Sequence, residues 1–190
     1  VEVAKSSEMP QNGKVFLQNL KQRLLPNPNI LNISGATYDF TTFFGATLME
    51  DMEDKKTIVY NNEVDSDYLS TLEIELLKGR NFSREMSLDA KNSALVNEKF
   101  VERYGLENPV GKKFSEFSKT KLVDYEIVGV IRDFHSESVH AEIGPTFLRF
   151  SNDEEYQFIY IKLKGTNIQN TLINIQNQFK ELSDKVPFIY

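Results

Sequence analysis

The chain contains no cysteine and no tryptophan among its 190 residues. Without cysteine it has no disulfide framework and no thiolate nucleophile. It has no apolar run approaching the ~20 residues that a helix needs to cross a bilayer, and no basic leader followed by an apolar stretch. Because its first residue is valine rather than methionine, we expect the chain to be a segment cut from a longer protein.

A large excess of either charge is also absent. Asp and Glu number 28 against 22 Lys and Arg, for a net charge of −6. A mildly acidic surface repels phosphate backbones and anionic lipid, so we expect no nucleic-acid partner. The 14 Phe and 8 Tyr argue for a folded chain rather than a disordered one. A chain of this length buries roughly 70% of its unfolded surface, which is enough for a core without disulfides.

Both ends of the chain show the same strand–helix–strand pattern. Apolar residues at the 3.6-residue period predict the helices, and Thr166 with Gln169 predicts a capping box. Helices that cross over between neighbouring parallel strands pack on one face of a sheet. The pattern therefore predicts one subdomain built from both ends, with the middle inserted into it. The predicted elements are strands over 1–4 and 30–36 around a helix over 13–25, and strands over 157–164 and from 187 onward around a helix over 166–185.

The middle of the chain, about 44–150, is predicted to be mostly β with short helices. A charged turn over 50–56 separates two strands that we expect to pair as a hairpin. Asp65 or Ser66 is predicted to cap one helix, and Asn97 and Gly105 are predicted to begin and end another. The fold class is therefore α+β. The predicted elements are strands over 46–49, 57–60, 93–96 and 125–132 and helices over 65–72 and 98–104.

Only two histidines are present, His135 and His140, and they lie near carboxylates in the stretch 133–140. Histidine and carboxylate side chains at short spacing can ligate zinc. The gap of five residues, however, is not the i, i+4 spacing that places two ligands on one helix face. A polar turn after a buried strand is the interpretation we favour, and we predict no metal site.

Other catalytic patterns are missing as well. The chain has no Gly-x-Ser-x-Gly elbow, and its Gly-Arg and Gly-Lys turns at 79–80 and 111–112 lack the patterns that bind phosphates or dinucleotides. Paired carboxylates abound, but acid–base work needs their pKa values pushed apart by burial. We interpret them as solvated turn and cap residues and predict no catalytic residue and no cofactor. These pairs are Asp65/Asp67, Glu73/Glu75 and the group Glu50/Asp51/Glu53/Asp54.

Five phrases follow one another through the middle of the chain. They are Val64-Asp-Ser-Asp-Tyr-Leu-Ser-Thr-Leu-Glu-Ile-Glu-Leu-Leu-Lys-Gly-Arg-Asn-Phe82, Ala94-Leu-Val-Asn-Glu98, Asn108-Pro-Val-Gly-Lys112, Glu126-Ile-Val-Gly-Val-Ile-Arg-Asp-Phe-His135 and Ile143-Gly-Pro145. In this order and spacing they resemble the extracytoplasmic core domain of ABC-transporter permeases of the macrolide-exporter (MacB-like) and FtsX-like class. The closest similarity is to permeases from Bacteroides-like bacteria.

The resemblance implies a two-part domain on the periplasmic side of the inner membrane. A membrane-proximal porter-like subdomain would comprise 1–43 and 151–190, and an inserted sabre-like subdomain would comprise 44–150. The domain would lie between the first and second of four transmembrane helices and would transmit ATP-driven conformational change rather than catalyse a reaction. The implied partners are its own transmembrane helices, a second permease copy, a cytoplasmic ATPase subunit or domain, and a periplasmic partner or a peptide, lipoprotein or drug substrate.

Two alternatives stay open from the sequence. One is a free-standing periplasmic or secreted binding module of the same fold, which would carry a cleaved leader and no membrane helices. The other is a metal-assisted enzyme using His135 and His140. The permease hypothesis instead expects an apolar helix just before Val1 and three more after Tyr190.

Overall fold

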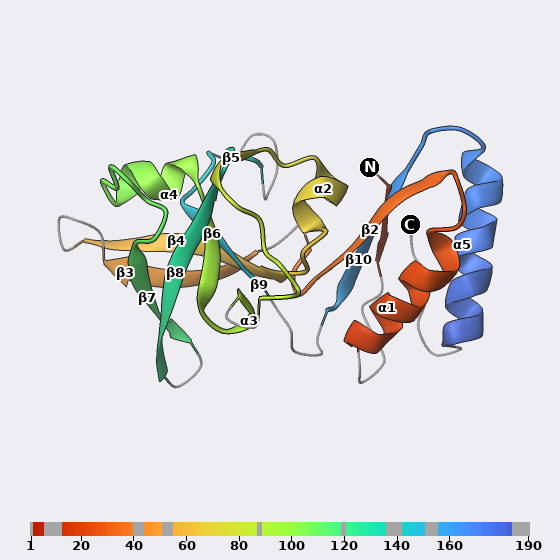
Figure 1. Ribbon diagram of the computed structural model, residues 1–190, viewed down its shortest axis with the longest axis horizontal. Coiled ribbons are helices and arrows are strands. Elements are labelled where there is room, and N and C mark those ends of the chain that lie inside the picture. Colours follow the sequence, from red (N-terminus) through yellow and green to blue (C-terminus); the bar gives the residue numbers. More distant parts are fainter. Residues whose placement is uncertain are drawn as a thin grey trace. The chain divides into compact units, whose positions relative to one another are not determined.

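The computed structural model describes residues 2–5, 13–39, 44–50, 55–86, 89–118, 121–135, 142–150 and 156–183. The predicted α+β class is confirmed by the strands and helices within these residues (Figure 1). In chain order they are β1 (Glu2–Lys5), α1 (Gly13–Leu24), β2 (Ile30–Ala36), β3 (Gly45–Glu50), β4 (Lys56–Val64), α2 (Tyr68–Leu72), β5 (Leu76–Gly79), α3 (Asp89–Asn92), β6 (Ser93–Asn97), α4 (Glu98–Arg103), β7 (Lys113–Ser118), β8 (Lys121–Ile131), β9 (Thr146–Phe150), β10 (Phe158–Leu163) and α5 (Ile168–Leu182).

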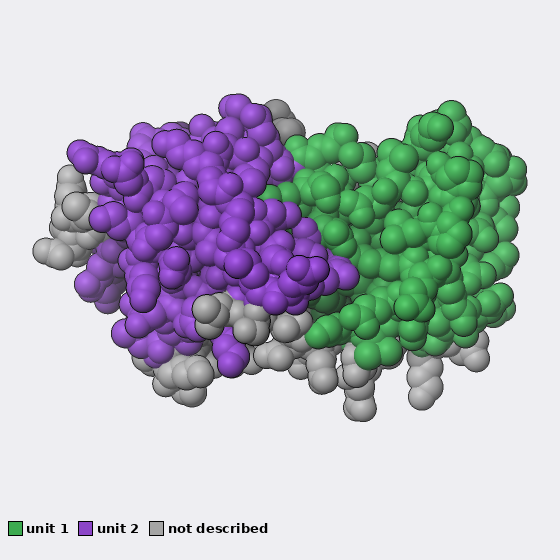
Figure 2. All heavy atoms as spheres, viewed as in Figure 1, with its two compact units in different colours: residues 1–37, 67–73, 152–190 green, residues 38–66, 74–151 purple. Residues whose placement is uncertain are grey.

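The chain forms two compact units, coloured separately in Figure 2. The terminal unit comprises residues 1–37, 67–73 and 152–190, and the inserted unit comprises 38–66 and 74–151. These boundaries differ from the predicted ones chiefly at residues 67–73. That stretch lies in the middle of the sequence but packs with the two ends of the chain.

The terminal unit contains a three-stranded antiparallel sheet in which β10 lies between β1 and β2. Tyr160 of β10 pairs with Val3 on one side and with Ser34 on the other. Since both outer strands are antiparallel to β10, they run parallel to each other, and α1 connects them. The expectation that such strands would be direct neighbours is corrected, because a strand from the far end of the chain occupies the place between them. The predicted strand from 187 onward lies outside the described residues.

Helices α1 and α5 pack on one face of this sheet (Figure 1). The rings of Phe16 and Phe179 meet edge to face at 5.4 Å between centroids, and Ile33 and Ile159 beneath them are fully buried. The predicted capping box of α5 is wrong. Asn167 is the N-cap residue, in the left-handed conformation and without a side-chain cap bond.

Helix α2 covers the opposite face of the same sheet (Figure 1). Side chains alternate along a strand, so Tyr160 faces away from the core around Ile159 and meets Tyr68 of α2, with 5.8 Å between ring centroids. Both tyrosines are fully buried. The helix begins at Tyr68 and its N-cap residue is Asp67, rather than the predicted Asp65 or Ser66.

The inserted unit contains a mixed sheet in the order β4-β9-β6-β8-β5, with β3 added to β4 and β7 added to β8. The pairs β4–β9 and β6–β8 are parallel and the other pairs are antiparallel. The predicted hairpin is confirmed, with Leu48 opposite Ile58, whereas β5, β7 and β9 were not predicted. An aromatic core formed by Phe100, Phe114 and Phe147 lies on one face, and its ring centroids are 5.1–6.4 Å apart.

The predicted role of Asn97 as a helix cap is confirmed, and the residue has a second role at the start of β9. Its side-chain oxygen accepts the amides of Phe100 at 2.9 Å and Thr146 at 2.8 Å, and its amide nitrogen donates to the carbonyl of Gly144 at 3.0 Å. A single buried amide therefore caps α4 and fixes the entry of β9.

Replacing Asn97 with alanine should lower the free energy of unfolding by about 2–3 kcal/mol, because a helix cap and buried hydrogen-bond partners are lost together. Urea denaturation measures this loss. The matched control is Asn92→Ala, which removes one exposed bond to the carbonyl of Asp124 and should change stability by less than about 1 kcal/mol. Equal losses in the two variants would contradict the second role of Asn97.

Candidate functional site

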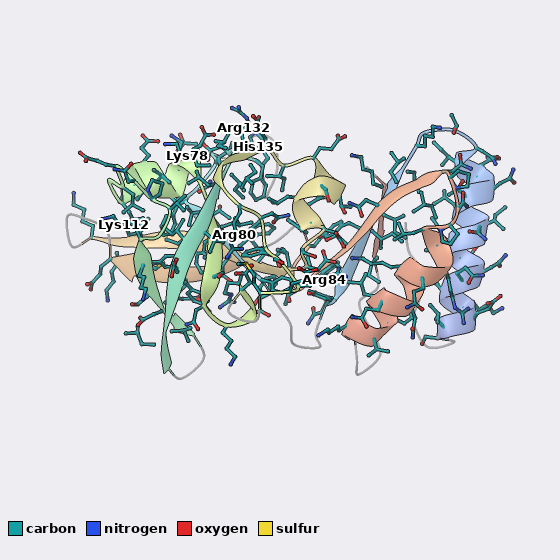
Figure 3. All side chains as sticks on the ribbon, in the orientation of Figure 1. Lys78, Arg80, Arg84, Lys112, Arg132 and His135 are labelled. Atoms are coloured by element: carbon teal, nitrogen blue, oxygen red, sulfur yellow. The ribbon has the colours of Figure 1, made fainter. Side chains whose placement is uncertain are left out.

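The two histidines are not brought into a described metal site. His135 is exposed at the surface of the inserted unit, where Figure 3 labels it together with Lys78 and Arg132. His140 lies outside the described residues. Among the described residues, no three or more His, Asp or Glu side chains gather as metal ligands. The charged side chains considered next form ion pairs.

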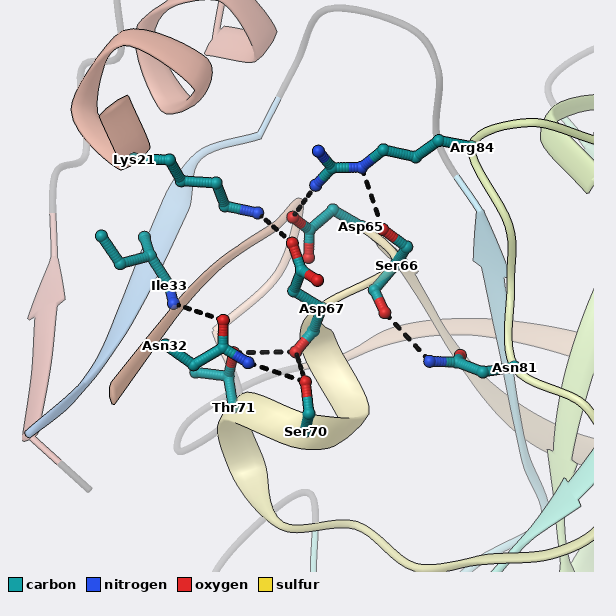
Figure 4. Close-up of polar contacts among 10 residues, drawn as sticks. All are labelled: Lys21, Asn32, Ile33, Asp65, Ser66, Asp67, Ser70, Thr71, Asn81 and Arg84. Carbon is teal, nitrogen blue, oxygen red and sulfur yellow. Dashed lines mark hydrogen bonds and ion pairs between the residues drawn. The ribbon is translucent and has the colours of Figure 1, made fainter. Parts of the chain in front are cut away.

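The carboxylate pairs of the stretch 65–75 do not form acid–base dyads, because each carboxylate pairs with a different cation. The interpretation of all of them as solvated is wrong for Asp65, whose side chain is 3% exposed. Neighbouring carboxylates in the sequence point to different partners, two of which are drawn in Figure 4. The ion pairs are Arg84–Asp65 at 3.2 Å, Lys21–Asp67 at 2.5 Å, Lys162–Glu73 at 2.7 Å and Arg132–Glu75 at 2.6 Å.

These four pairs follow the path of the chain through a segment that we call the crossover segment, residues 65–75. The chain leaves the inserted unit after Ser66 and returns to it after Glu73. Asp65 and Glu75, just outside these crossings, pair with cations of the inserted unit. Asp67 and Glu73, just inside them, pair with cations of the terminal unit. Each ion pair therefore joins residues of one unit only.

Further hydrogen bonds reinforce the first crossing (Figure 4). The Asp67 carbonyl accepts the hydroxyls of Ser70 at 2.9 Å and Thr71 at 2.7 Å, within α2. Ser66, on the other side of the crossing, accepts Asn81 Nδ2 at its carbonyl and Arg84 Nε at its hydroxyl, both at 2.9 Å. The two residues that flank the crossing are thus each bound within their own unit.

Glu73 marks the second crossing with an uncommon backbone conformation. It caps the C-terminus of α2 with φ 59° and ψ 33°, in the left-handed region, which is unfavourable for a residue with a Cβ atom. The hydrogen bond from Lys162 lowers the pKa of Glu73, and the bond from Arg132 lowers the pKa of Glu75. Both carboxylates are therefore ionised at neutral pH and available to their partners.

A second ionic cluster is largely buried in the inserted unit, around Arg149 of β9. Its Nη1 donates to Glu116 Oε2 at 2.8 Å and to the Tyr125 hydroxyl at 3.2 Å, and its Nη2 lies 3.1 Å from Glu63 Oε1. The guanidinium carbon lies 5.9 Å from the ring centres of Tyr125 and Phe147. Burial raises the pKa of Glu116, and Arg149 opposes that rise.

This cluster was not predicted from the sequence. The signal that could have indicated it is a charged residue at an inward position of an alternating strand. Glu116 lies two residues from Phe114 and Arg149 two residues from Phe147, so each charged side chain shares a face with a core aromatic.

The Gly79-Arg80 phrase also has a structural basis. Gly79 has φ +75°, and a Cβ atom there would lie 2.3 Å from the carbonyl oxygen of Val128. Arg80 then forms a bidentate pair with the fully buried Asp89, at 2.7 and 2.8 Å. Although burial opposes ionisation, hydrogen bonds from Arg80, Ser83 and Ser93 lower the pKa of Asp89. The phrase therefore serves folding of the inserted unit.

The fold defines the class of protein. It is a two-unit α+β domain in which both described ends of the chain belong to one unit. In the described part of the chain, no helix combines the length and apolar character that crossing a membrane requires.

Comparison with known proteins identifies the family. Residues 11–177 match the model of the MacB-like periplasmic core domain, and the chain belongs to this family. It is therefore the periplasmic domain of an ABC transporter permease, a family of transporter domains rather than enzymes, and it is extracytoplasmic in an inner-membrane transporter. Permeases of this class work with transmembrane segments and an ATPase. Among curated proteins, no sequence matches the chain.

Solved structures share the fold at low sequence identity. The extracellular domain of the noncanonical ABC-type transporter YknZ from Gram-positive bacteria has a TM-score of 0.68 at 12% identity, covering 99% of this chain and 98% of that one. The periplasmic region of MacB from Actinobacillus actinomycetemcomitans has a TM-score of 0.67 at 14% identity, covering 98% and 86%. A domain of a putative permease from Porphyromonas gingivalis has a TM-score of 0.59 at 16% identity, covering 98% and 87%.

Proposed function

We propose that this domain transmits ATP-driven conformational change to the periplasmic side and contacts substrate or partner proteins there. The terminal unit would be the membrane-proximal, porter-like part and the inserted unit the sabre-like part. The partners would be the permease's own transmembrane helices, a second permease copy and, indirectly, the cytoplasmic ATPase. Its cargo or partner would be a peptide, a lipoprotein, a drug or a periplasmic protein.

One observation carries this proposal. Strand β1 near the beginning of the described chain and helix α5 near its end both belong to the terminal unit. A displacement of membrane segments attached to either end would therefore act first on that unit. The inserted unit would receive it through the covalent crossings of the chain and through residues 67–73, which the terminal unit holds.

Spin labels in the full-length permease with its ATPase test the proposal. The chain has no cysteine of its own, so Leu122→Cys in the inserted unit and Ile173→Cys in the terminal unit, both over half exposed, are unique labelling sites once other permease cysteines are replaced. We expect the distance between the two copies' labels to differ between nucleotide-free and ATP-trapped states at both sites. Membrane-impermeant maleimide should label both positions in intact cells.

The control is an ATPase variant that cannot bind nucleotide, in which the distances should not change. Distances that are the same in every nucleotide state would overturn transmission by this domain. Labelling that requires a permeabilised inner membrane would overturn its periplasmic placement.

A further inference from the structure

We propose that the crossover segment is a double hinge with ionic clamps, in which the segment bends at the Ser66–Asp67 and Glu73–Ile74 links. Lys21 and Lys162 hold α2 in the terminal unit, while Arg84 and Arg132 hold the flanking residues in the inserted unit. The inference extends the proposed function. The role of the bending rests on that function. The clamps themselves are properties of the 190-residue chain and are tested on it directly.

The clamped residues at each crossing are close together in the sequence. At the first crossing the clamped residues, Asp65 and Asp67, are two positions apart, and at the second Glu73 and Glu75 are again two apart. At each crossing the two carboxylates nevertheless bind different cations, one in each unit. Little backbone is left between the clamps, so a change of torsion angle within the crossover segment would fall there. Hinges of this kind are a few element-terminal residues that absorb the change.

The backbone conformation of Glu73 supports the second hinge point. A left-handed residue other than glycine persists only where the surroundings enforce it. Two hydrogen bonds hold Glu73 here. Its side chain accepts a bond from Lys162 at 2.7 Å, and its backbone amide donates to the carbonyl of Leu69. The C-terminus of α2 is therefore held by the same residue that forms the clamp.

An earlier crossing of the chain, at Thr37–Tyr38 and outside the crossover segment, provides a contrast within the same molecule. Asn62 accepts the amide of Tyr38 and donates to its carbonyl, both at 3.0 Å, and the carbonyl of Ala36 accepts the amide of Gln157 at 2.9 Å. These bonds are neutral. Salt screens exposed charges but not neutral amide pairs, so ionic strength acts differently on these bonds and on the ion pairs of the crossover segment.

Hydrogen exchange read by mass spectrometry tests the clamps on the 190-residue chain. The reporters are the amides of Thr71, Glu73 and Arg132, which donate to the carbonyls of Asp67, Leu69 and Glu75. Raising NaCl from 0.02 to 0.5 M should speed exchange at these amides by roughly threefold to tenfold, the effect of screening half-exposed pairs. Exchange at Tyr38 should stay constant.

Variants make the same test without salt. Asp67→Asn combined with Glu73→Gln should speed exchange in α2 by a similar factor and leave α1 and β10 unchanged. Glu102→Gln, which removes the exposed pair with Lys99 at 2.7 Å, is the matched control and should have no effect on α2. The charge reversal Glu73→Lys with Lys162→Glu should restore protection that either substitution alone removes.

Two results would overturn the inference. Unchanged exchange at Thr71 and Glu73 would mean that the ion pairs do not hold α2. Equal acceleration across α1, β10 and α2 would mean that α2 opens only when the whole terminal unit unfolds, which leaves no hinge. Either result can occur whether or not the spin-label experiment shows transmission, so the two proposals fail separately.

Discussion

Replacing Arg149 with methionine should lower the free energy of unfolding by about 3–5 kcal/mol, the usual cost of leaving a buried charge without its partner. The side chains of Arg149 and Glu116 are only 13% and 5% exposed. Methionine keeps much of the volume between the Tyr125 and Phe147 rings, so the loss reports the missing charge rather than a cavity. Urea denaturation followed by circular dichroism measures it.

The partner substitution is the decisive control. Glu116→Gln in the Arg149→Met background should recover most of the loss, because the uncompensated carboxylate is then gone. The pH dependence of stability provides an independent test. Burial raises the pKa of Glu116, and in Arg149→Met the folded protein therefore takes up this proton before the unfolded chain does. Stability must then rise as the pH falls from 8 towards 5. A deficit that is independent of pH and of residue 116 would refute this account.

Replacing Tyr68 with alanine should also cost about 3–5 kcal/mol, since a fully buried aromatic ring is removed. Tyr68 has no exposed surface and packs edge to face on Tyr160, so the second face of the terminal sheet would lose its main contact with α2. The denaturation midpoint measures the change, and hydrogen exchange locates it in the terminal unit.

The matched control for Tyr68→Ala is Leu122→Ala. Leu122 is large and apolar but 63% exposed, and its truncation should change stability by less than about 0.5 kcal/mol. A comparably small loss in Tyr68→Ala would show that α2 is not part of the core of the terminal unit.

Local features of this fold were predictable because their causes lie within a few residues. The apolar stripe of Phe16, Leu20 and Leu24 predicted a helix over 13–25, and α1 spans Gly13–Leu24. The strand predicted over 30–36 has the bounds of β2. Asn97 was recognised as a cap because a short amide before a helix satisfies free backbone donors.

Strands whose partners are remote in the sequence were not predictable in this way. In the sequence, β9 is a short apolar run after Pro145. It becomes a strand by pairing with β4 and β6 on either side. The burial of Asp65 was also missed, because its partner Arg84 lies 19 residues away.

By itself, the sequence determined the α+β class, the two amphipathic helices, the cap at Asn97 and, through its ordered phrases, the permease family. Each depends on periodicity or on residue types in a continuous stretch. Only the tertiary structure decided that α2 packs with the two ends of the chain and that four carboxylates in eleven residues serve two different units. Sheet pairing and ion pairing join residues that are far apart along the chain, and no local pattern encodes which partner each will meet.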